Sequence, residues 1–172
     1  MLMAAETMLF TGLIGAYVVL RGSAEVWPPP DQPRLPIGVT WVNTAVLLVS
    51  CWTMRRASVA LAGRAASSLF RALVQTAALG STFLVIQGTE WVRLIRYGLT
   101  VSSGLYGATF YTLIGVHAFH VLAAVIWLIW VTARFRGRRF SLGRAAVADM
   151  CALYWYYVCG LWAILFPLVY LL

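Results

Sequence analysis

The segment GLYGATFYTLIGVHAFHVLAAVIWLIWVTA, residues 104–133, contains no Asp, Glu, Lys or Arg. A helix needs about 20 predominantly apolar residues to cross a bilayer, so this segment predicts a transmembrane helix. It also holds both histidines of the chain, His117 and His120. Because they lie three residues apart, a helix places both imidazoles near one face.

The rest of the chain has the same apolar character. Hydrophobic residues make up 62% of the sequence and charged residues 10%, whereas an ordinary soluble domain carries about 25% charged residues. The expected spans cover residues 1–20, 36–56, 71–92, 104–133 and 146–172. We therefore predict an all-α polytopic membrane protein, with a bundle of five transmembrane helices forming a single transmembrane domain over residues 1–172.

The arginines are divided unevenly among the four connections between these spans. Two connections carry nine of them, namely Arg55, Arg56, Arg64, Arg71, Arg134, Arg136, Arg138, Arg139 and Arg144. The other two carry Arg21, Arg34, Arg93 and Arg96, together with acidic residues. Cytoplasmic loops hold the excess of basic residues in membrane proteins. We therefore expect a cytoplasmic N-terminus and a C-terminus on the outer side.

Acidic side chains in or beside the spans are candidate functional groups, because a charge within a membrane is costly and usually has a partner. Glu6 lies about one turn into the first span. It is either a proton-exchanging or headgroup-contacting carboxyl, or an interfacial residue that the helix dipole favours. Glu90 and Asp149 are at span ends, and we interpret both as interfacial charges.

The histidines and cysteines give little support for a metal site. A haem or copper centre needs ligands that converge from several elements, and His117 and His120 come from one span. We expect them to be satisfied by interhelical hydrogen bonds instead. The three cysteines, Cys51, Cys151 and Cys159, form no close-spaced pair and are expected to be buried small hydrophobic residues.

Five motifs in order along the chain resemble subunit III of the haem–copper respiratory oxidases, which include cytochrome c oxidase and its quinol oxidase relatives. They are AETMLFTGLIGAYVVLR with Glu6, WPP followed by VNTAVLL, QGTEWVRL with Glu90, GLYGATFYTLIGVHAFHVL, and DMCALYWYYVCGLWAILFPLVYL with Asp149 and the Tyr154-Trp155 pair. The resemblance covers nearly the whole chain and fits the five-helix form of the family.

The resemblance implies a non-catalytic subunit of a terminal oxidase in the bacterial inner (plasma) membrane. Such a subunit packs on the catalytic subunit, holds phospholipid, and supports proton uptake and durability during aerobic respiration. The haem and copper are expected in the partner catalytic subunit, and no cofactor other than phospholipid is expected on this chain. The resemblance aligns Arg134 and Arg144 with positions that contact lipid phosphates.

One departure from the family pattern falls in the last span. The family's usual Tyr-Trp-His-Phe-Val-Asp reads YWYYVC here, so Tyr156 replaces the histidine and Cys159 replaces the aspartate. Any proton-relay role of that pair is therefore in question for this chain. Two alternatives remain open at this point: an accessory subunit of a related complex such as a nitric oxide reductase, and a small membrane transporter.

Overall fold

The computed structural model describes residues 2–30, 32–136 and 142–171, and within these ranges it contains helices and no strand. The helices are α1 (Leu2–Gly22), α2 (Ile37–Ala62), α3 (Ala66–Arg96), α4 (Leu105–Phe135) and α5 (Leu142–Phe166), followed by the π-helical turn η1 (Pro167–Leu171). Five of these described segments are long and apolar enough to cross a membrane. The predicted all-α fold with five transmembrane helices is confirmed.

Most helices extend beyond the ranges expected from the sequence. Helix α2 continues to Ala62 and α3 begins at Ala66, so that Gly63, Arg64 and Ala65 alone connect them. The expected spans are shorter because their bounds follow the apolar stretches of the sequence, which end at or near arginine. Arginine can instead stay helical, with its apolar stem against the membrane and its charged group in water.

The last candidate span runs from Gly143 to Leu171, but its helical geometry changes near the end. Helix α5 ends at Phe166, and Pro167 begins the π-helical turn. Proline has no backbone N–H and its ring clashes with the preceding turn. The backbone therefore changes its hydrogen-bond pattern at this residue.

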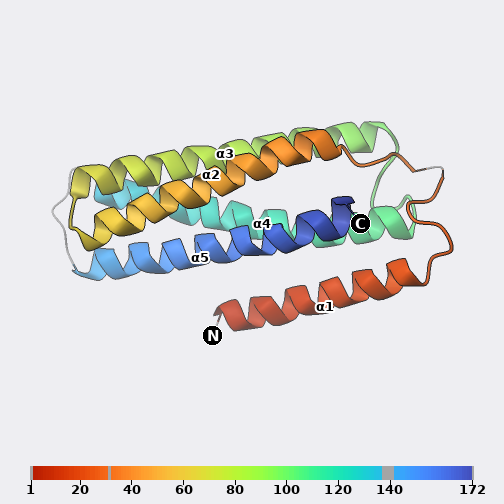
Figure 1. Ribbon diagram of the computed structural model, residues 1–172, viewed down its shortest axis with the longest axis horizontal. Helices are drawn as coiled ribbons and strands as arrows, with labels where there is room; N and C mark the ends of the chain where they lie inside the picture. The colour runs from red at the N-terminus through yellow and green to blue at the C-terminus, as the bar shows by residue number, and fades with distance from the viewer. Residues whose placement is uncertain (1, 31, 137–141, 172) are drawn as a thin grey trace.

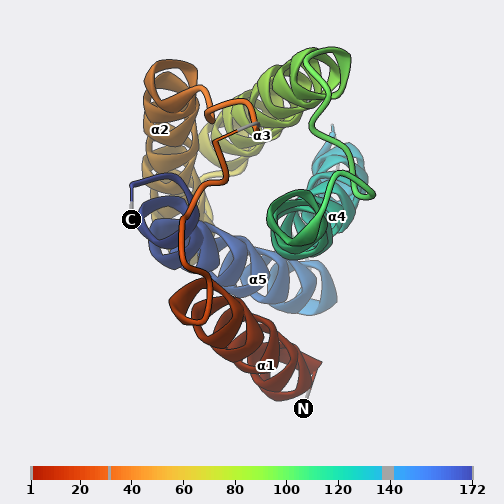
Figure 2. The same ribbon diagram turned by 90° about the vertical axis from the view of Figure 1, so that its right-hand side faces the viewer.

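Successive helices run in opposite directions, and α2 to α5 surround a common core while α1 lies outside them (Figures 1 and 2). The α2–α3 turn, the end of α4 and the start of α5 lie at one end of the bundle, which thus gathers Arg64, Arg134 and Arg144 (Figure 1). Arg138 and Arg139 lie outside the described residues. The connections after α1 and α3 lie at the opposite end.

Two large tryptophans of α5 anchor the core. Trp155 and Trp162 are almost completely buried. The Trp155 indole donates to Ser50 Oγ at 3.2 Å, and the Trp162 indole donates to Thr44 Oγ1 at 2.9 Å. Gly80 of α3 leaves room for the Trp155 ring, because a Cβ at Gly80 would overlap that ring. Tryptophan packing and polar bonds therefore join α5 to α2 and α3.

Helix α1 is held less extensively than the others. Among its described side chains, Phe10 and Tyr17 are the two that are buried. It lies beside α5 (Figure 2) and also contacts α4, and near its C-terminal end Tyr17 and Arg21 donate hydrogen bonds to the Leu168 carbonyl at 3.4 and 3.3 Å. The attachment of α1 thus depends on a small number of specific contacts.

Candidate functional site

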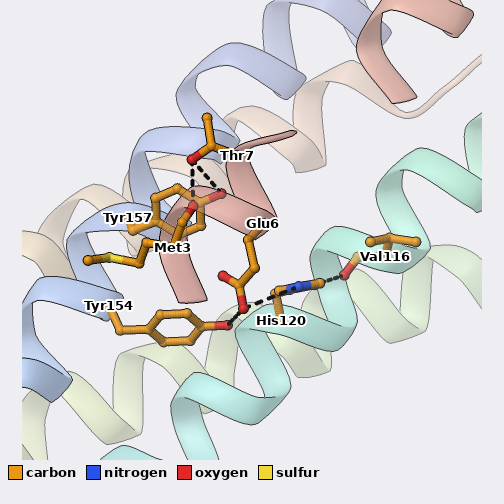
Figure 3. A network of polar contacts seen from close by, with 7 residues as sticks. All are labelled: Met3, Glu6, Thr7, Val116, His120, Tyr154 and Tyr157. Carbon is orange, nitrogen blue, oxygen red and sulfur yellow. Dashed lines mark hydrogen bonds and ion pairs between the residues drawn. The ribbon is translucent and has the colours of Figure 1, made fainter. Parts of the chain in front are cut away.

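A polar cluster around Glu6 joins α1 to α4 and α5 (Figure 3). Tyr154 of α5 donates a hydrogen bond from its hydroxyl to Glu6 Oε1 at 3.4 Å. His120 Nε2 of α4 lies 3.8 Å from the same carboxylate oxygen. Three helices therefore contribute one carboxyl, one imidazole and one phenol to a single site.

A backbone carbonyl orients the His120 ring. His120 Nδ1 lies 2.7 Å from the Val116 carbonyl oxygen, one turn earlier in α4. Since a carbonyl oxygen can only accept, Nδ1 carries a proton and donates it. In the neutral ring Nε2 is then the basic nitrogen, and it faces Glu6. The pair can hold one proton either as Glu6 carboxylic acid or as a His120 imidazolium next to a carboxylate.

The Glu6–His120 pair is largely shielded from solvent. The side chains of Glu6 and His120 are each 13% exposed. The Phe10 ring meets the His120 ring edge-on with centroids 5.2 Å apart. Within the described ranges, Glu6 Oε2 is buried and has no hydrogen-bond partner. Such surroundings strengthen electrostatic interactions because little water screens them.

The site lies deeper in the bundle than the position of Glu6 in the sequence suggests. Glu6 belongs to the first turns of α1, but His120 is at the middle of α4. In Figure 1 the start of α1 lies well inside the end of the bundle formed by α2 to α5. Glu6 therefore lies within the length of the bundle rather than at its end.

His117 differs from the expectation. It is fully buried, and within the described part of the chain neither ring nitrogen has a hydrogen-bond partner. The expected interhelical hydrogen bond is therefore wrong for His117. Its ring stacks on Trp162 with centroids 5.2 Å apart and an interplanar angle of 26°. Aromatic packing, rather than a polar contact, fixes this side chain.

Arg134 and Arg144 lie together at the end of the bundle where α4 ends and α5 begins. They line one cavity of about 260 Å³ together with Trp130 and other residues of both helices. The Arg134 guanidinium lies over the Trp130 ring, 4.3 Å from its centroid. Within the described residues, Arg144 Nε is buried without a hydrogen-bond partner. The two arginines selected from the sequence thus share one basic site.

The remaining candidates lie elsewhere. Glu90 is buried near the end of α3 and forms an ion pair of 2.8 Å with Arg93. Asp149 is exposed on α5. Trp155 belongs to the core, whereas Tyr156 is exposed and Cys159 is buried.

The cysteines are partly as expected. Cys151 and Cys159 are buried, but Cys51 is half-buried. None of the three forms a disulfide within the described ranges. No group of three or more His, Cys, Asp or Glu side chains in those ranges is arranged to hold a metal ion.

Two contacts at the site escaped the sequence analysis. The Thr7 hydroxyl lies 3.3 Å from the Tyr157 hydroxyl, one turn from the Glu6–Tyr154 contact (Figure 3). Glu6 and Thr7 are adjacent in α1, and each contacts a different tyrosine of α5, Tyr154 and Tyr157, which are about one turn apart. The tyrosines of YWYY, residues 154–157, can be recognised in the sequence as polar groups within the last span, but the sequence does not show which helix they face.

Comparison with known proteins gives a consistent result over the whole chain. The family model described as "Cytochrome c oxidase subunit III" matches residues 1–172. The "Cytochrome c oxidase subunit 3" of Synechocystis sp. is 33% identical, covering 99% of this chain and 72% of the relative. The "Probable cytochrome c oxidase subunit 3" of Nocardia farcinica is 30% identical, with coverages of 98% and 83%. The Bacillus subtilis protein named "Cytochrome c oxidase subunit 3" is 28% identical, with coverages of 99% and 82%.

Proposed function

The chain belongs to the cytochrome c oxidase subunit III family, and we propose that, as subunit III of a haem–copper oxidase, it binds anionic phospholipid and supports proton uptake through Glu6. The full-length family match does not favour an accessory subunit of a nitric oxide reductase or a small transporter. The observation that carries the proton part is the approach of His120 Nε2 to Glu6 Oε1, at 3.8 Å.

The chemistry of this pair suits proton storage. A carboxyl and an imidazole that share little water can pass one proton between them with a small change in geometry. Val116 keeps the proton on Nδ1, so that Nε2 is the nitrogen available to Glu6. Tyr154 stabilises the ionised carboxylate by donating to the same oxygen. The cluster would take up a proton near the partner subunit and release it without changing the fold.

The cavity between Arg134 and Arg144 supports the lipid part of the proposal. Guanidinium groups bind phosphate oxygens through paired N–H donors. Basic pockets on the cytoplasmic side of transmembrane helices are typical sites for anionic lipid headgroups. Trp130 is 46% exposed beside Arg134 and offers an apolar surface for the adjoining acyl chain.

The haem and copper of the oxidase are assigned to the partner catalytic subunit. The donor set of the described residues does not fit a redox centre, because no three His, Cys, Asp or Glu side chains come together there and His117 is enclosed by aromatic rings. The proposal therefore routes no electron transfer through this chain. Its contribution is to the supply of protons and to the lipid environment of the complex.

The partnership can be tested by purification. A tagged chain expressed in its native membrane is expected to co-purify with a large subunit that carries the haem absorbance of a terminal oxidase. Mass spectrometry of the purified complex identifies that subunit, and metal analysis of the isolated, folded chain is expected to find no stoichiometric haem or copper. Purification of the intact chain without a haem-containing partner would contradict the proposed assembly.

The orientation can be tested with reporter tags. A tag in the α2–α3 turn is expected to report the cytoplasm and a tag after α5 the outer side, because arginine-rich ends remain cytoplasmic. Labelling of engineered cysteines by a membrane-impermeant reagent provides the measurement. A C-terminus that is inaccessible from outside in intact cells and accessible after lysis would contradict this orientation.

A further inference from the structure

The arrangement at Arg134 has a counterpart on the other helical hairpin of the bundle. Trp130 and Arg134 are four residues apart near the end of α4, and Trp52 and Arg56 have the same spacing towards the end of α2. Residues four apart in a helix are neighbours on its surface. The Arg56 guanidinium accordingly lies over the Trp52 ring, 5.0 Å from its centroid.

A cavity accompanies this second tryptophan–arginine pair. It has a volume of about 420 Å³ and lies between α2 and the start of α3, where Trp52, Arg55, Arg56, Val59 and Ser68 contribute to its lining. At Arg134 the second basic group comes from the next helix, whereas here it is the adjacent Arg55. Both cavities thus combine two arginines with an exposed tryptophan.

The positive charge of this cavity has no acidic partner among the residues that the structure describes. The sequence contains no Asp or Glu between Ile37 and Thr89. Within the described residues, no carboxylate forms an ion pair with Arg55 or Arg56. An anion therefore finds no competing acidic side chain at this end of the hairpin, because Glu90 lies near the far end of α3 and pairs with Arg93.

The apolar side of the cavity indicates what kind of anion fits. Trp52 is 58% exposed and Val59 is 66% exposed, and both line the cavity with the arginines. A free inorganic anion would leave this apolar surface uncovered. A phospholipid would place its phosphate against the guanidinium groups and its acyl chain along Trp52 and Val59.

We propose that the cavity between Trp52, Arg55 and Arg56 is a second binding site for an anionic phospholipid, on the α2–α3 hairpin. Arg56 lies over the indole ring, and the N–H groups in the plane of its guanidinium would donate to phosphate oxygens. The proposal uses the same headgroup chemistry as the Arg134–Arg144 site and rests on the lipid part of the proposed function. The two sites use different residues and can be removed separately.

The test counts lipid molecules bound to the intact oxidase complex. The complex is reconstituted in nanodiscs of phosphatidylglycerol and phosphatidylcholine, released in mild detergent, and analysed by native mass spectrometry. The double variant Arg55→Gln/Arg56→Gln is expected to lose one phosphatidylglycerol relative to the unmodified complex. Arg134→Gln/Arg144→Gln is expected to lose a different one, and the combination of both double variants should lose two.

Two further variants separate binding from general charge. Arg71→Gln removes a positive charge from the same hairpin outside the cavity and is expected to retain both lipids. Arg56→Lys keeps the charge but not the planar fork, and it should weaken retention at the second site. Equal retention by Arg56→Lys and the unmodified complex, or loss of lipid in Arg71→Gln, would show that charge alone is responsible and would overturn the site.

The remaining outcomes distinguish the two lipid proposals. If the Arg55/Arg56 variant retains its lipid while the Arg134/Arg144 variant loses one, the second site is wrong and the first stands. The reverse result would refute the first site alone, and retention in both variants would refute both. Displacement of phosphatidylglycerol by excess inorganic phosphate would identify a phosphate-ion site and overturn the assignment to lipid.

Discussion

Replacing Gly80 by alanine is expected to weaken the assembled fold by about 3 kcal/mol, at the upper end of the usual cost of overpacking a core. A Cβ at this position would overlap the Trp155 ring and also lie 3.0 Å from Val125 Cγ2. The Trp155 ring is fully buried and is held by its bond to Ser50, so it cannot move away without breaking that bond. The midpoint of thermal unfolding of this subunit in the purified complex measures the effect.

Gly88 provides the control, because it belongs to the same helix. A Cβ at Gly88 would meet no atom within 4 Å. Alanine favours a helix over glycine by about 1 kcal/mol, so Gly88→Ala should leave the midpoint unchanged or raise it. Similar losses in both variants would show that Gly80 is not needed for the approach of Trp155.

Replacing Glu6 by glutamine is expected to preserve assembly, haem spectra and initial turnover, and to reduce activity several-fold over many turnovers. Glutamine keeps the shape of the side chain and an oxygen that can accept from Tyr154, so α1 should remain attached. What is lost is the ability to ionise. Oxygen consumption followed over successive additions of reductant measures the decline, and lipid content is measured in parallel.

Tyr154→Phe is the matched comparison for Glu6→Gln. It removes the hydroxyl that contacts Glu6 but leaves the carboxyl and His120 in place. Sustained activity should therefore fall less than in Glu6→Gln. If Glu6→Gln sustains turnover as well as the unmodified protein, the cluster is a mechanical link between helices. Immediate loss of turnover with disturbed haem spectra would show that Glu6 has a different role.

The number and type of helices were predictable because they follow from composition over long windows. A backbone inside a membrane must form its hydrogen bonds within the protein, so a hydrophobic stretch of spanning length has few alternatives to a helix. The residues at which the helices begin and end were less predictable, because a charged residue can lie either outside a helix or within its last turns. Arg71 and Arg93 are both helical in α3, and Pro167 changed the end of the last span.

The candidate site was predictable residue by residue but not as an arrangement. Glu6 and His120 each stood out as polar groups in apolar segments, and helical periodicity assigns each to a face. Periodicity does not show which helices meet, so neither their contact nor the approach of Tyr154 could be derived. His117 shows the same limit, because its environment depends on where Trp162 of another helix lies. The Trp52–Arg56 pair repeats a spacing visible in the sequence, but the cavity beside it is a product of the α2–α3 turn.

The separation between Glu6 and its partners has a consequence for biosynthesis. Tyr154 is 148 residues further along the chain than Glu6. At a synthesis rate of roughly 5–20 residues per second, the ribosome reaches Tyr154 about 7–30 s after Glu6. During that interval the cluster is incomplete: the Glu6 carboxyl has neither partner until α4 brings His120, and it lacks the Tyr154 hydroxyl until α5 is made. A carboxylate within a membrane is costly without a partner. Translation of α5 therefore sets the moment at which the earliest helix can take its final place.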